Sequence, residues 1–178
     1  MNIFYLSNNV TECAEFHNNR HVVKMILEYT QLLSTAHRVL DGKEVVEKTA
    51  KGRNVTRWVL PEPLDNILYK ATHINHPSAI WVRKSADNYL WLHQMLLALI
   101  KEYTYRYEKH HKCEAISSYL NSVPINIGKE VFTEPTPAMP DECKIIGDSI
   151  RSYRNYYVMK KQHIAAWKNR PIPEWFNS

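Results

Sequence analysis

The sequence predicts a mostly α-helical, single compact domain, in which three long helices are joined by short helices and a proline-rich loop. Apolar residues recur at spacings of three and four over long stretches, which is the period of a half-buried helix. Hydrophobic residues make up 44% and aromatic residues 11% of the 178-residue chain, enough for a packed core. Glycine is scarce, with four residues, so the helix ends fall mostly at the nine prolines. We therefore expect one helical domain over residues 1–178.

Residues 11–40 are predicted to form one long helix around which the chain is organised. Thr11 is the predicted N-cap, and Asp41 and Gly42 mark the end of the helix. The apolar positions expected to face the core are Val23, Ile26, Leu27, Leu33, Ala36 and Leu40. Residues 2–6 precede this helix as a short strand or as an extended arm packed on the core.

The middle of the chain is predicted to hold two more helices. Residues 43–57 are polar and mixed in charge, which favours a loop with room for one helical turn. A pair of prolines then opens a second helix at residues 64–72, since proline is favoured at a helix start. After a turn at residues 73–77, a third helix runs from residue 78 or 85 to residue 107. Its face toward the first helix is expected to contain Tyr89, Leu92, Leu96, Leu99 and Tyr103.

The C-terminal part is predicted to be less regular. Residues 108–122 hold a polar break and a short helix, and residues 123–142 form the proline-rich connection on the surface. A last helix covers residues 147–167 and is followed by an extended end. Trp175 and Phe176 are expected to anchor that end on the domain.

The net charge of +5 is concentrated in residues 144–178. Seven Lys and Arg residues there face only two carboxylates, whereas residues 1–143 contain equal numbers of each sign. A basic segment of this kind favours a polyanionic partner, with nucleic acid first, and we expect it to pack on or flank the helical domain. The alternative is a solvated helix face without a partner.

The cysteines and the hydropathy pattern indicate a cytoplasmic protein. Cys13, Cys113 and Cys143 are scattered and odd in number, as is typical of reduced thiols. The longest apolar run, residues 95–100, is too short to span a bilayer, and the first residues do not have the pattern of a signal peptide. We therefore expect no contact with a membrane.

The first helix carries a stripe of ionisable residues. His17, His21, Lys24 and Glu28 follow one another at spacings of four, three and four, so they share one face of a helix. An amine beside a carboxylate is the pair that imine chemistry needs, because the amine attacks and the carboxylate moves protons. The alternative is an ordinary ion pair between Lys24 and Glu28, with the two histidines packed against other helices.

A second candidate site is the turn that contains His73 and His76. With Arg83 and Lys84 after it, this turn could hold a phosphate or orient a base. The two histidines could also join those of the stripe as zinc ligands, but the glutamate of an H-E-x-x-H motif is missing. We therefore predict neither a metal nor another cofactor, and the alternative is a turn stabilised by histidine hydrogen bonds.

A third candidate is the basic C-terminal segment, where cations alternate with aromatic rings. Cations contact phosphates and flat rings stack on bases, so this mixture is typical of a nucleic-acid surface. The residues concerned are Arg151, Tyr153, Arg154, Tyr156, Tyr157, Lys161 and Trp167. The alternative is that these aromatic rings belong to the core, which we expect for Tyr153 and Tyr157.

Five motifs resemble known proteins. They are HVVKMILE (His21–Glu28), THINHPSAIWVR (Thr72–Arg83), YTYRY (Tyr103–Tyr107), PTPAMP (Pro135–Pro140) and RPIPEWF (Arg170–Phe176). Through them the chain is similar, over nearly its whole length, to a group of small tailed-phage proteins. If the gene belongs to a phage, the expected location is the cytoplasm of the host cell. More distantly, its layout resembles the pyrimidine-dimer DNA glycosylase family of the endonuclease V type.

The second resemblance implies a DNA repair enzyme with N-glycosylase and AP-lyase activities on damaged pyrimidines. In that family an α-amine attacks C1′ of the sugar, an imine forms, and β-elimination cleaves the strand, while a nucleotide is extruded from the duplex. Glu28 matches the catalytic glutamate when the helices are aligned on His21. When they are aligned on Arg20, His21 takes that position instead. Because Asn2 is large, Met1 is expected to be retained, so the amine is that of Met1 or of Lys24.

The same resemblance implies double-stranded, damaged DNA as the partner. His73 or His76 would orient the site, and the predicted DNA-binding residues are Arg20, Arg83, Lys84, Arg151, Arg154, Lys161, Trp167 and Arg170. One alternative is an enzyme that acts on modified bases or free nucleotides. Another is a non-catalytic phage protein that binds nucleic acid, a nucleotide or a host protein. The sequence does not predict an oligomeric state.

Overall fold

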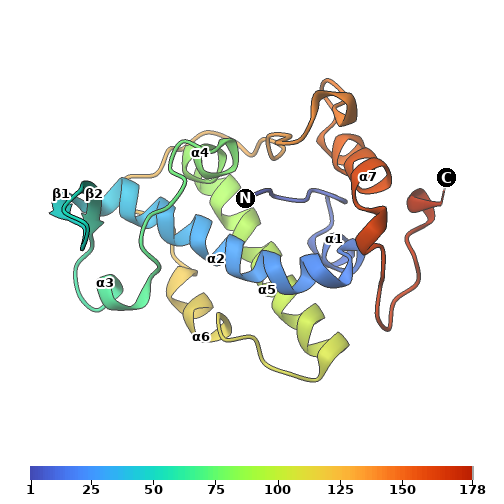
Figure 1. The fold of residues 1–178 in the computed structure, drawn as a ribbon, viewed down its shortest axis with the longest axis horizontal. Coiled ribbons are helices and arrows are strands. Elements are labelled where there is room, and N and C mark those ends of the chain that lie inside the picture. Colours follow the sequence, from blue (N-terminus) through green and yellow to red (C-terminus); the bar gives the residue numbers. More distant parts are fainter. Residues whose placement is uncertain (178) are drawn as a thin grey trace.

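Two long helices, α2 (Asn19–Asp41) and α5 (Ala86–Tyr107), cross at the centre of the computed structural model, which describes residues 1–177 (Figure 1). Helix α1 (Val10–Phe16) packs against α5, and α4 (Pro77–Lys84) packs against both long helices. The remaining helices are α3 (Leu64–Ile67), α6 (Glu114–Ser117) and α7 (Ser149–Lys160), with 3-10 turns at Ser118–Leu120, Asp141–Cys143, Gln162–Ile164 and Glu174–Phe176. The predicted mostly α-helical fold class is confirmed.

The first predicted helix is in fact two helices, because two asparagines interrupt it. Asn9 caps α1, where its Oδ1 accepts from the backbone N–H groups of Thr11 and Glu12, both at 3.0 Å. Asn18 caps α2, where its Oδ1 lies 2.9 Å from the N–H of His21. Asparagine is among the best N-cap residues, so these caps replace the predicted cap at Thr11.

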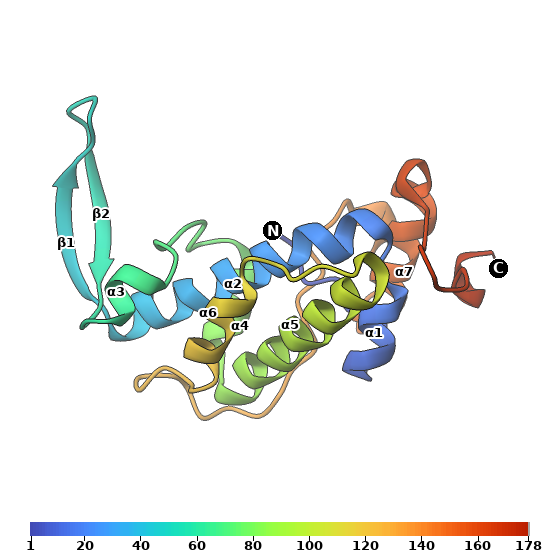
Figure 2. The same cartoon turned by 90° about the horizontal axis from the view of Figure 1, so that it is seen from below.

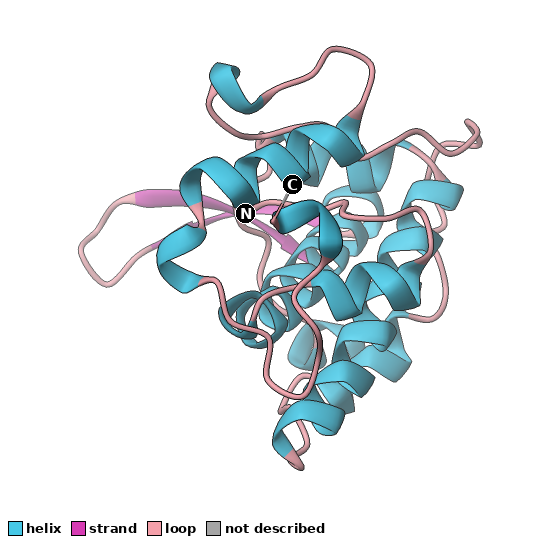
Figure 3. Ribbon diagram, turned by 90° about the vertical axis from the view of Figure 1, so that its right-hand side faces the viewer, coloured by secondary structure: helices cyan, strands magenta, loops and turns pink. Residues whose placement is uncertain are grey.

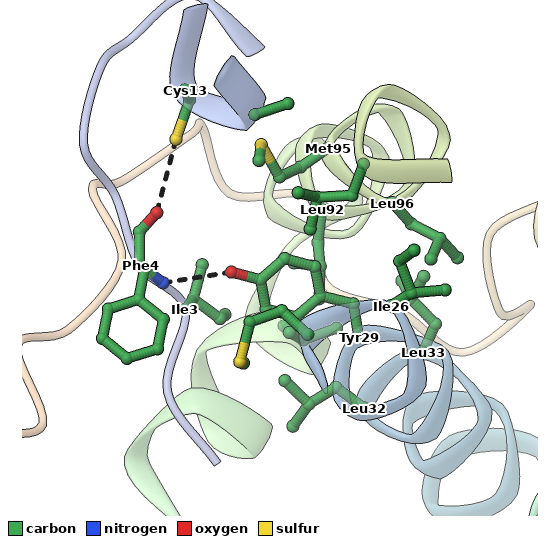
Figure 4. Close-up of a cluster of buried hydrophobic side chains, with 14 of the residues drawn as sticks. Ile3, Phe4, Cys13, Ile26, Tyr29, Leu32, Leu33, Leu92, Met95 and Leu96 are labelled. Atoms are coloured by element: carbon green, nitrogen blue, oxygen red, sulfur yellow. Dashed lines mark hydrogen bonds between the residues drawn. The ribbon is translucent and has the colours of Figure 1, made fainter. Parts of the chain in front are cut away.

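Residues 3–6 form an extended arm rather than a strand, and all four are buried in the core. The N–H of Phe4 donates to the hydroxyl of Tyr29 at 3.1 Å, and the thiol of Cys13 donates to the carbonyl of Phe4 at 3.3 Å (Figure 4). At the start of the arm, the hydroxyl of Ser78 donates to the carbonyl of Met1 at 3.2 Å. The arm therefore fixes Met1 close to the beginning of α4.

Residues 43–57, which were predicted to be a loop, form most of a β-hairpin. Strand β1 (Lys43–Lys48) pairs antiparallel with β2 (Asn54–Val59), from Lys43 opposite Val59 to Lys48 opposite Asn54. These are the two strands in the part of the chain that the structure describes (Figure 3). The β-branched residues within both segments favour strands, and the polar composition concealed that signal.

Arg38 of α2 anchors the chain that follows the hairpin. Its five N–H groups donate to the carbonyls of Trp58, Asp65, Leu68 and Tyr69 and to the carboxylate of Asp65, at 2.6–2.8 Å. Because these carbonyls turn toward Arg38, they are not available to continue a helix. The predicted helix over residues 64–72 is accordingly reduced to α3.

Serine and aspartate caps set the remaining boundaries. Ser85 has an extended backbone and accepts from the N–H of Asn88, so α5 begins after it and α4 is a separate helix. Asp148 caps α7, which ends at Lys160, earlier than the predicted 167. No helix among residues 1–177 is long and apolar enough to cross a membrane.

Candidate active site

A small surface pocket of about 130 Å³ lies where the N-terminal arm, α2 and the end of α7 meet. Its lining residues are Met1, Asn2, Phe4, His21, Lys24, Met25, Glu28, Tyr156 and Lys161. Three of the predicted catalytic residues, His21, Lys24 and Glu28, therefore lie in one pocket with Met1. Their spacing on α2 places them there, since residues three and four apart share a helix face.

Glu28 and Lys24 form the predicted ion pair, with Nζ and Oε1 3.2 Å apart. The carboxylate side chain is 14% exposed, whereas the lysine side chain is 67% exposed. An ion pair with one exposed partner contributes at most about 1 kcal/mol to stability. Glu28 is thus a largely shielded carboxylate at the wall of the pocket, and Lys24 is a mobile cation at its rim.

His21 is a neutral imidazole. Its ring stacks on Phe4 at 4.1 Å between centroids, and its Nδ1 lies 2.6 Å from the hydroxyl of Tyr157. Burial, followed by the nearby His17, lowers the pKa of His21 to about 2. Burial raises the pKa of Tyr157 far above its usual value, so the phenol keeps its proton. The two neutral side chains share a hydrogen bond in which either group can be the donor.

His17 is a packing histidine outside the pocket, because the break between α1 and α2 removes it from the stripe. Its Nδ1–H donates to the carbonyl of Cys13 at 2.6 Å, and its Nε2 lies 3.4 Å from the hydroxyl of Tyr29. Burial lowers the pKa of His17 to about 4.

His76 lies near the pocket, at the N-cap of α4, and its Nδ1 accepts from the N–H of Ser78 at 3.1 Å. Burial, followed by the charge of the Met1 amine, lowers the pKa of His76, while Glu28 raises it. Ser78, two residues further on, donates to the carbonyl of Met1, which lines the pocket. His73 is exposed, with φ +49°, and its Nδ1 lies 2.7 Å from the hydroxyl of Thr72.

Metal ligation by the four histidines finds no geometric support. Among residues 1–177, no group of three or more His, Cys, Asp or Glu side chains lies close enough together to hold a metal ion. His17 and His76 instead have the protein hydrogen-bond partners described above.

Four of the predicted DNA-binding residues are committed to internal contacts. Arg83 donates to the carbonyl of Ile74 at 2.6 Å, and Arg154 donates to that of Leu6 at 3.0 Å. Arg170 pairs with the buried Glu102 at 2.9 and 3.1 Å, and its guanidinium covers the ring of Tyr105. Trp167 is buried, and its N–H donates to the carbonyl of Phe16 at 2.9 Å. The contacts of Arg154, Trp167 and Arg170 hold the C-terminal segment against the N-terminal arm and the helices, and that of Arg83 holds the turn before α4.

The other four keep accessible charges. Arg20 is exposed in the first turn of α2, and Lys161 lines the pocket with its ammonium 4.6 Å from the ring centre of Tyr156. Lys84 is exposed and pairs with Glu130 at 3.1 Å, and Arg151 pairs with Asp148 at 4.0 Å. Surface pairs of this kind open at little cost, so these cations remain available to phosphates.

Sequence reasoning missed Asn2, Phe4, Met25 and Tyr156 as pocket residues. Tyr156 is far from α2 in the sequence, and no local pattern indicates that α7 packs beside the N-terminal arm. A larger pocket of about 530 Å³, between α1 and the C-terminal residues, contains none of the predicted catalytic residues.

The buried histidines predict a loss of stability in acid. Between about pH 6.5 and pH 4 the unfolded chain binds protons that His17 and His21 do not bind in the folded state. The free energy of unfolding should therefore fall by about 1.4 kcal/mol per pH unit for each of the two. Urea unfolding at pH 7 and pH 5 measures this difference. His17→Gln should reduce it, whereas the same change at the exposed His163 should not; equal pH dependence in all three proteins would contradict the prediction.

A family model described as pyrimidine dimer DNA glycosylase matches residues 1–115. The matched part includes the N-terminal arm, α2, the hairpin and the turn at His76, and it excludes α7. No curated protein and no solved structure matches the chain. The resemblance to tailed-phage proteins stays a prediction.

Proposed function

Because the chain belongs to the pyrimidine dimer DNA glycosylase family, and is a DNA repair glycosylase at that level, we propose that it excises damaged pyrimidines from duplex DNA and cleaves the strand through an imine. The observation that supports this is the pocket that Met1 lines together with Lys24 and Glu28, where Nζ of Lys24 lies 3.2 Å from the shielded carboxylate of Glu28. An amine nucleophile beside a carboxylate base is what glycosylase and lyase chemistry both need.

The proposed reaction begins when a neutral amine attacks C1′ of the deoxyribose. The bond from C1′ to the base breaks, and the base leaves with its electron pair and takes up a proton. Opening of the sugar ring then gives an imine between the amine and C1′. Glu28 stabilises the cationic sugar and removes a proton from C2′, after which the bond from C3′ to the phosphate oxygen breaks. Water hydrolyses the imine and restores the amine.

Where Met1 carries a free α-amino group, we favour that group over Lys24 as the nucleophile. The attacking form is the neutral amine, and α-amino groups are weaker bases than lysines, by about 2 to 3 pH units. A lysine becomes a comparable nucleophile when it is desolvated, but the Lys24 side chain is two-thirds exposed. The carbonyl of Met1 is fixed by Ser78, which restricts where the amine lies.

The size of the pocket favours a DNA strand over a free nucleotide. Sites for whole small molecules are usually about 300–1,000 Å³, whereas this pocket is about 130 Å³. It therefore fits a sugar presented by a larger substrate whose phosphates contact the surrounding surface. Arg20, Lys84, Arg151 and Lys161 supply cations for those phosphates.

Borohydride trapping tests this proposal, because borohydride reduces an imine to a stable amine. The protein is mixed with a labelled duplex, either ultraviolet-irradiated or undamaged, and reduced. We expect a covalent protein–DNA band on the irradiated duplex alone, with the adduct on the peptide that contains Met1. An adduct on the Lys24 peptide would reassign the nucleophile. Binding of irradiated DNA without an adduct would contradict the imine, and no binding to either duplex would contradict DNA as the substrate.

A further inference from the structure

The β-hairpin of β1 and β2 extends away from the helical body. Figure 2 shows it beyond the end of α2, on the side where the N-terminus lies, with the segment after α7 rising from the same side at the other end of α2. Most hairpin residues are exposed, and Val46 is 66% exposed. An isolated two-stranded hairpin is marginally stable in water. A projection of this kind therefore needs an anchor at its base, and its exposed residues are free to contact a partner.

The base of the hairpin is firmly anchored. Gly42 joins α2 to β1 at a position where a Cβ would lie 2.5 Å from the carbonyl oxygen of Arg38 and 2.9 Å from the Cβ of Trp58. That close approach requires glycine. The carbonyl of Trp58 also accepts from the guanidinium of Arg38 at 2.8 Å. The hairpin is thus held in a defined direction relative to α2.

The hairpin is strongly basic. Its five cations, against the two carboxylates of Glu44 and Glu47, are Lys43, Lys48, Lys51, Arg53 and Arg57. Three of them lie around the tip, in residues 48–53, where there is no carboxylate. Arg57 pairs with Glu47 at 3.8 Å, whereas Lys48, Lys51 and Arg53 form no ion pair within residues 1–177. The tip therefore presents three uncompensated positive charges, which complement a polyanion.

The length of α2 sets the distance between the hairpin and the candidate active site. From Glu28 to Asp41 the helix rises about 20 Å, at 1.5 Å per residue. Base pairs in a duplex are about 3.4 Å apart, so for a duplex that lies along α2 this length corresponds to roughly six base pairs. Each strand of the hairpin has six residues, about 20 Å at the usual rise, and a two-stranded ribbon fits the major groove, which is about 12 Å wide.

We propose that the hairpin is a DNA-binding arm that contacts the phosphates along the major groove, about six base pairs from the nucleotide held in the pocket. This inference rests on the proposed function, since it takes duplex DNA as the substrate. It adds a contact region that is separate from the pocket and from the basic C-terminal segment. The tip cations provide affinity for DNA, and the anchored base sets the register of the duplex on the protein.

The test compares the wild-type protein with the variant K48Q/K51Q/R53Q. A charge-matched control, K101Q/K109Q/K112Q, removes three exposed cations near the end of α5. Fluorescence anisotropy measures the affinity for a duplex with a stable abasic analogue and about twelve base pairs on each side, more than one helical turn of about 10 base pairs. The affinity is measured over a series of salt concentrations. Circular dichroism verifies that both variants are folded.

We expect the hairpin variant to lose affinity by about 10-fold or more at low salt. Its log–log salt slope should be smaller by about two to three, since each phosphate contact contributes about 0.9. Shortening the duplex to about four base pairs on the hairpin side should weaken the wild-type protein and leave the hairpin variant nearly unaffected. Equal losses in the hairpin variant and the control, or wild-type affinity in the hairpin variant, would overturn the proposal. Borohydride trapping of the wild-type protein is run in parallel. A missing adduct contradicts the proposed imine chemistry, whereas the affinities of the variants show whether the hairpin binds DNA.

Discussion

Glu28→Gln is expected to reduce the rate of strand cleavage at a damaged pyrimidine by about 10²–10⁴-fold, the usual contribution of a general acid–base residue. The amide has nearly the shape of the carboxylate, so the pocket keeps its form, but it has no charge for the cationic sugar and cannot accept the C2′ proton. The partner amine of Lys24 is exposed, so losing the ion pair should cost at most about 1 kcal/mol of stability. Single-turnover cleavage of an irradiated duplex measures the rate.

Glu142→Gln is the matched control for Glu28→Gln. Glu142 also pairs with a lysine, Lys160, at 2.9 Å, but it lies outside the pocket. Its rate should stay near that of the wild-type protein, as should the melting temperature of both variants. A Glu28→Gln rate within a few-fold of wild type, in a protein that still cleaves damaged DNA, would remove Glu28 from the catalytic role. That result would also contradict the alignment of the family motif on His21.

The helical part of this fold could be predicted because its signals are local. Spacings of three and four place Lys24 and Glu28 on one face of α2, and that geometry holds wherever the helix packs. The division of the first helix was missed because the helical period continues across His17. The side-chain oxygen of Asn18 caps α2, and the preference of asparagine for a cap outweighed the helical pattern.

The contacts that complete the site depend on tertiary structure. Met1 reaches the pocket because the buried arm holds it there, and Lys161 reaches it because α7 packs beside that arm. Counting charges does not show which cations already have a partner. Arg170 was predicted as a DNA contact from its place in the basic segment, and the structure pairs it with Glu102 of α5. A sequence gives the charge of a residue, but it does not show whether that residue already forms an ion pair with a buried partner.

The hairpin was missed for a related reason. Residues 43–57 were interpreted as a loop because they are polar, yet a strand that projects into solvent has no buried face to produce an apolar alternation. Its remaining signal is β propensity, at Val45, Val46, Val55 and Thr56, which is weaker and depends on context. An exposed arm that contacts DNA needs polar side chains for the phosphates and a regular backbone to hold them in place, so a polar composition does not exclude strands.

Arg38→Met is expected to lower the free energy of unfolding by about 3–5 kcal/mol, the usual effect of removing one partner from a buried charged network. Arg38 is fully buried in α2, and all five of its N–H groups have acceptors. Methionine fills similar space but donates no hydrogen bond. The change would remove one donor from the carboxylate of Asp65, which keeps those of Leu60 and Lys70, and would leave four backbone carbonyls without the guanidinium. Each buried group left unsatisfied carries a desolvation cost.

Lys70→Met is the control for Arg38→Met, because it also removes a cation beside Asp65 but leaves the buried guanidinium and its hydrogen bonds in place. Lys70 lies 3.3 Å from the same carboxylate, but its side chain is 57% exposed, so its loss should cost at most about 1 kcal/mol. The N–H of Leu60, followed by Arg38, lowers the pKa of Asp65 to about 2, so that carboxylate is charged at neutral pH in both variants. Urea unfolding at pH 7 compares the three proteins. If Arg38→Met were no more destabilising than Lys70→Met, the guanidinium would not be the anchor of the hairpin base. The close approach of Gly42 to Arg38 and Trp58 would then have to hold the hairpin against α2.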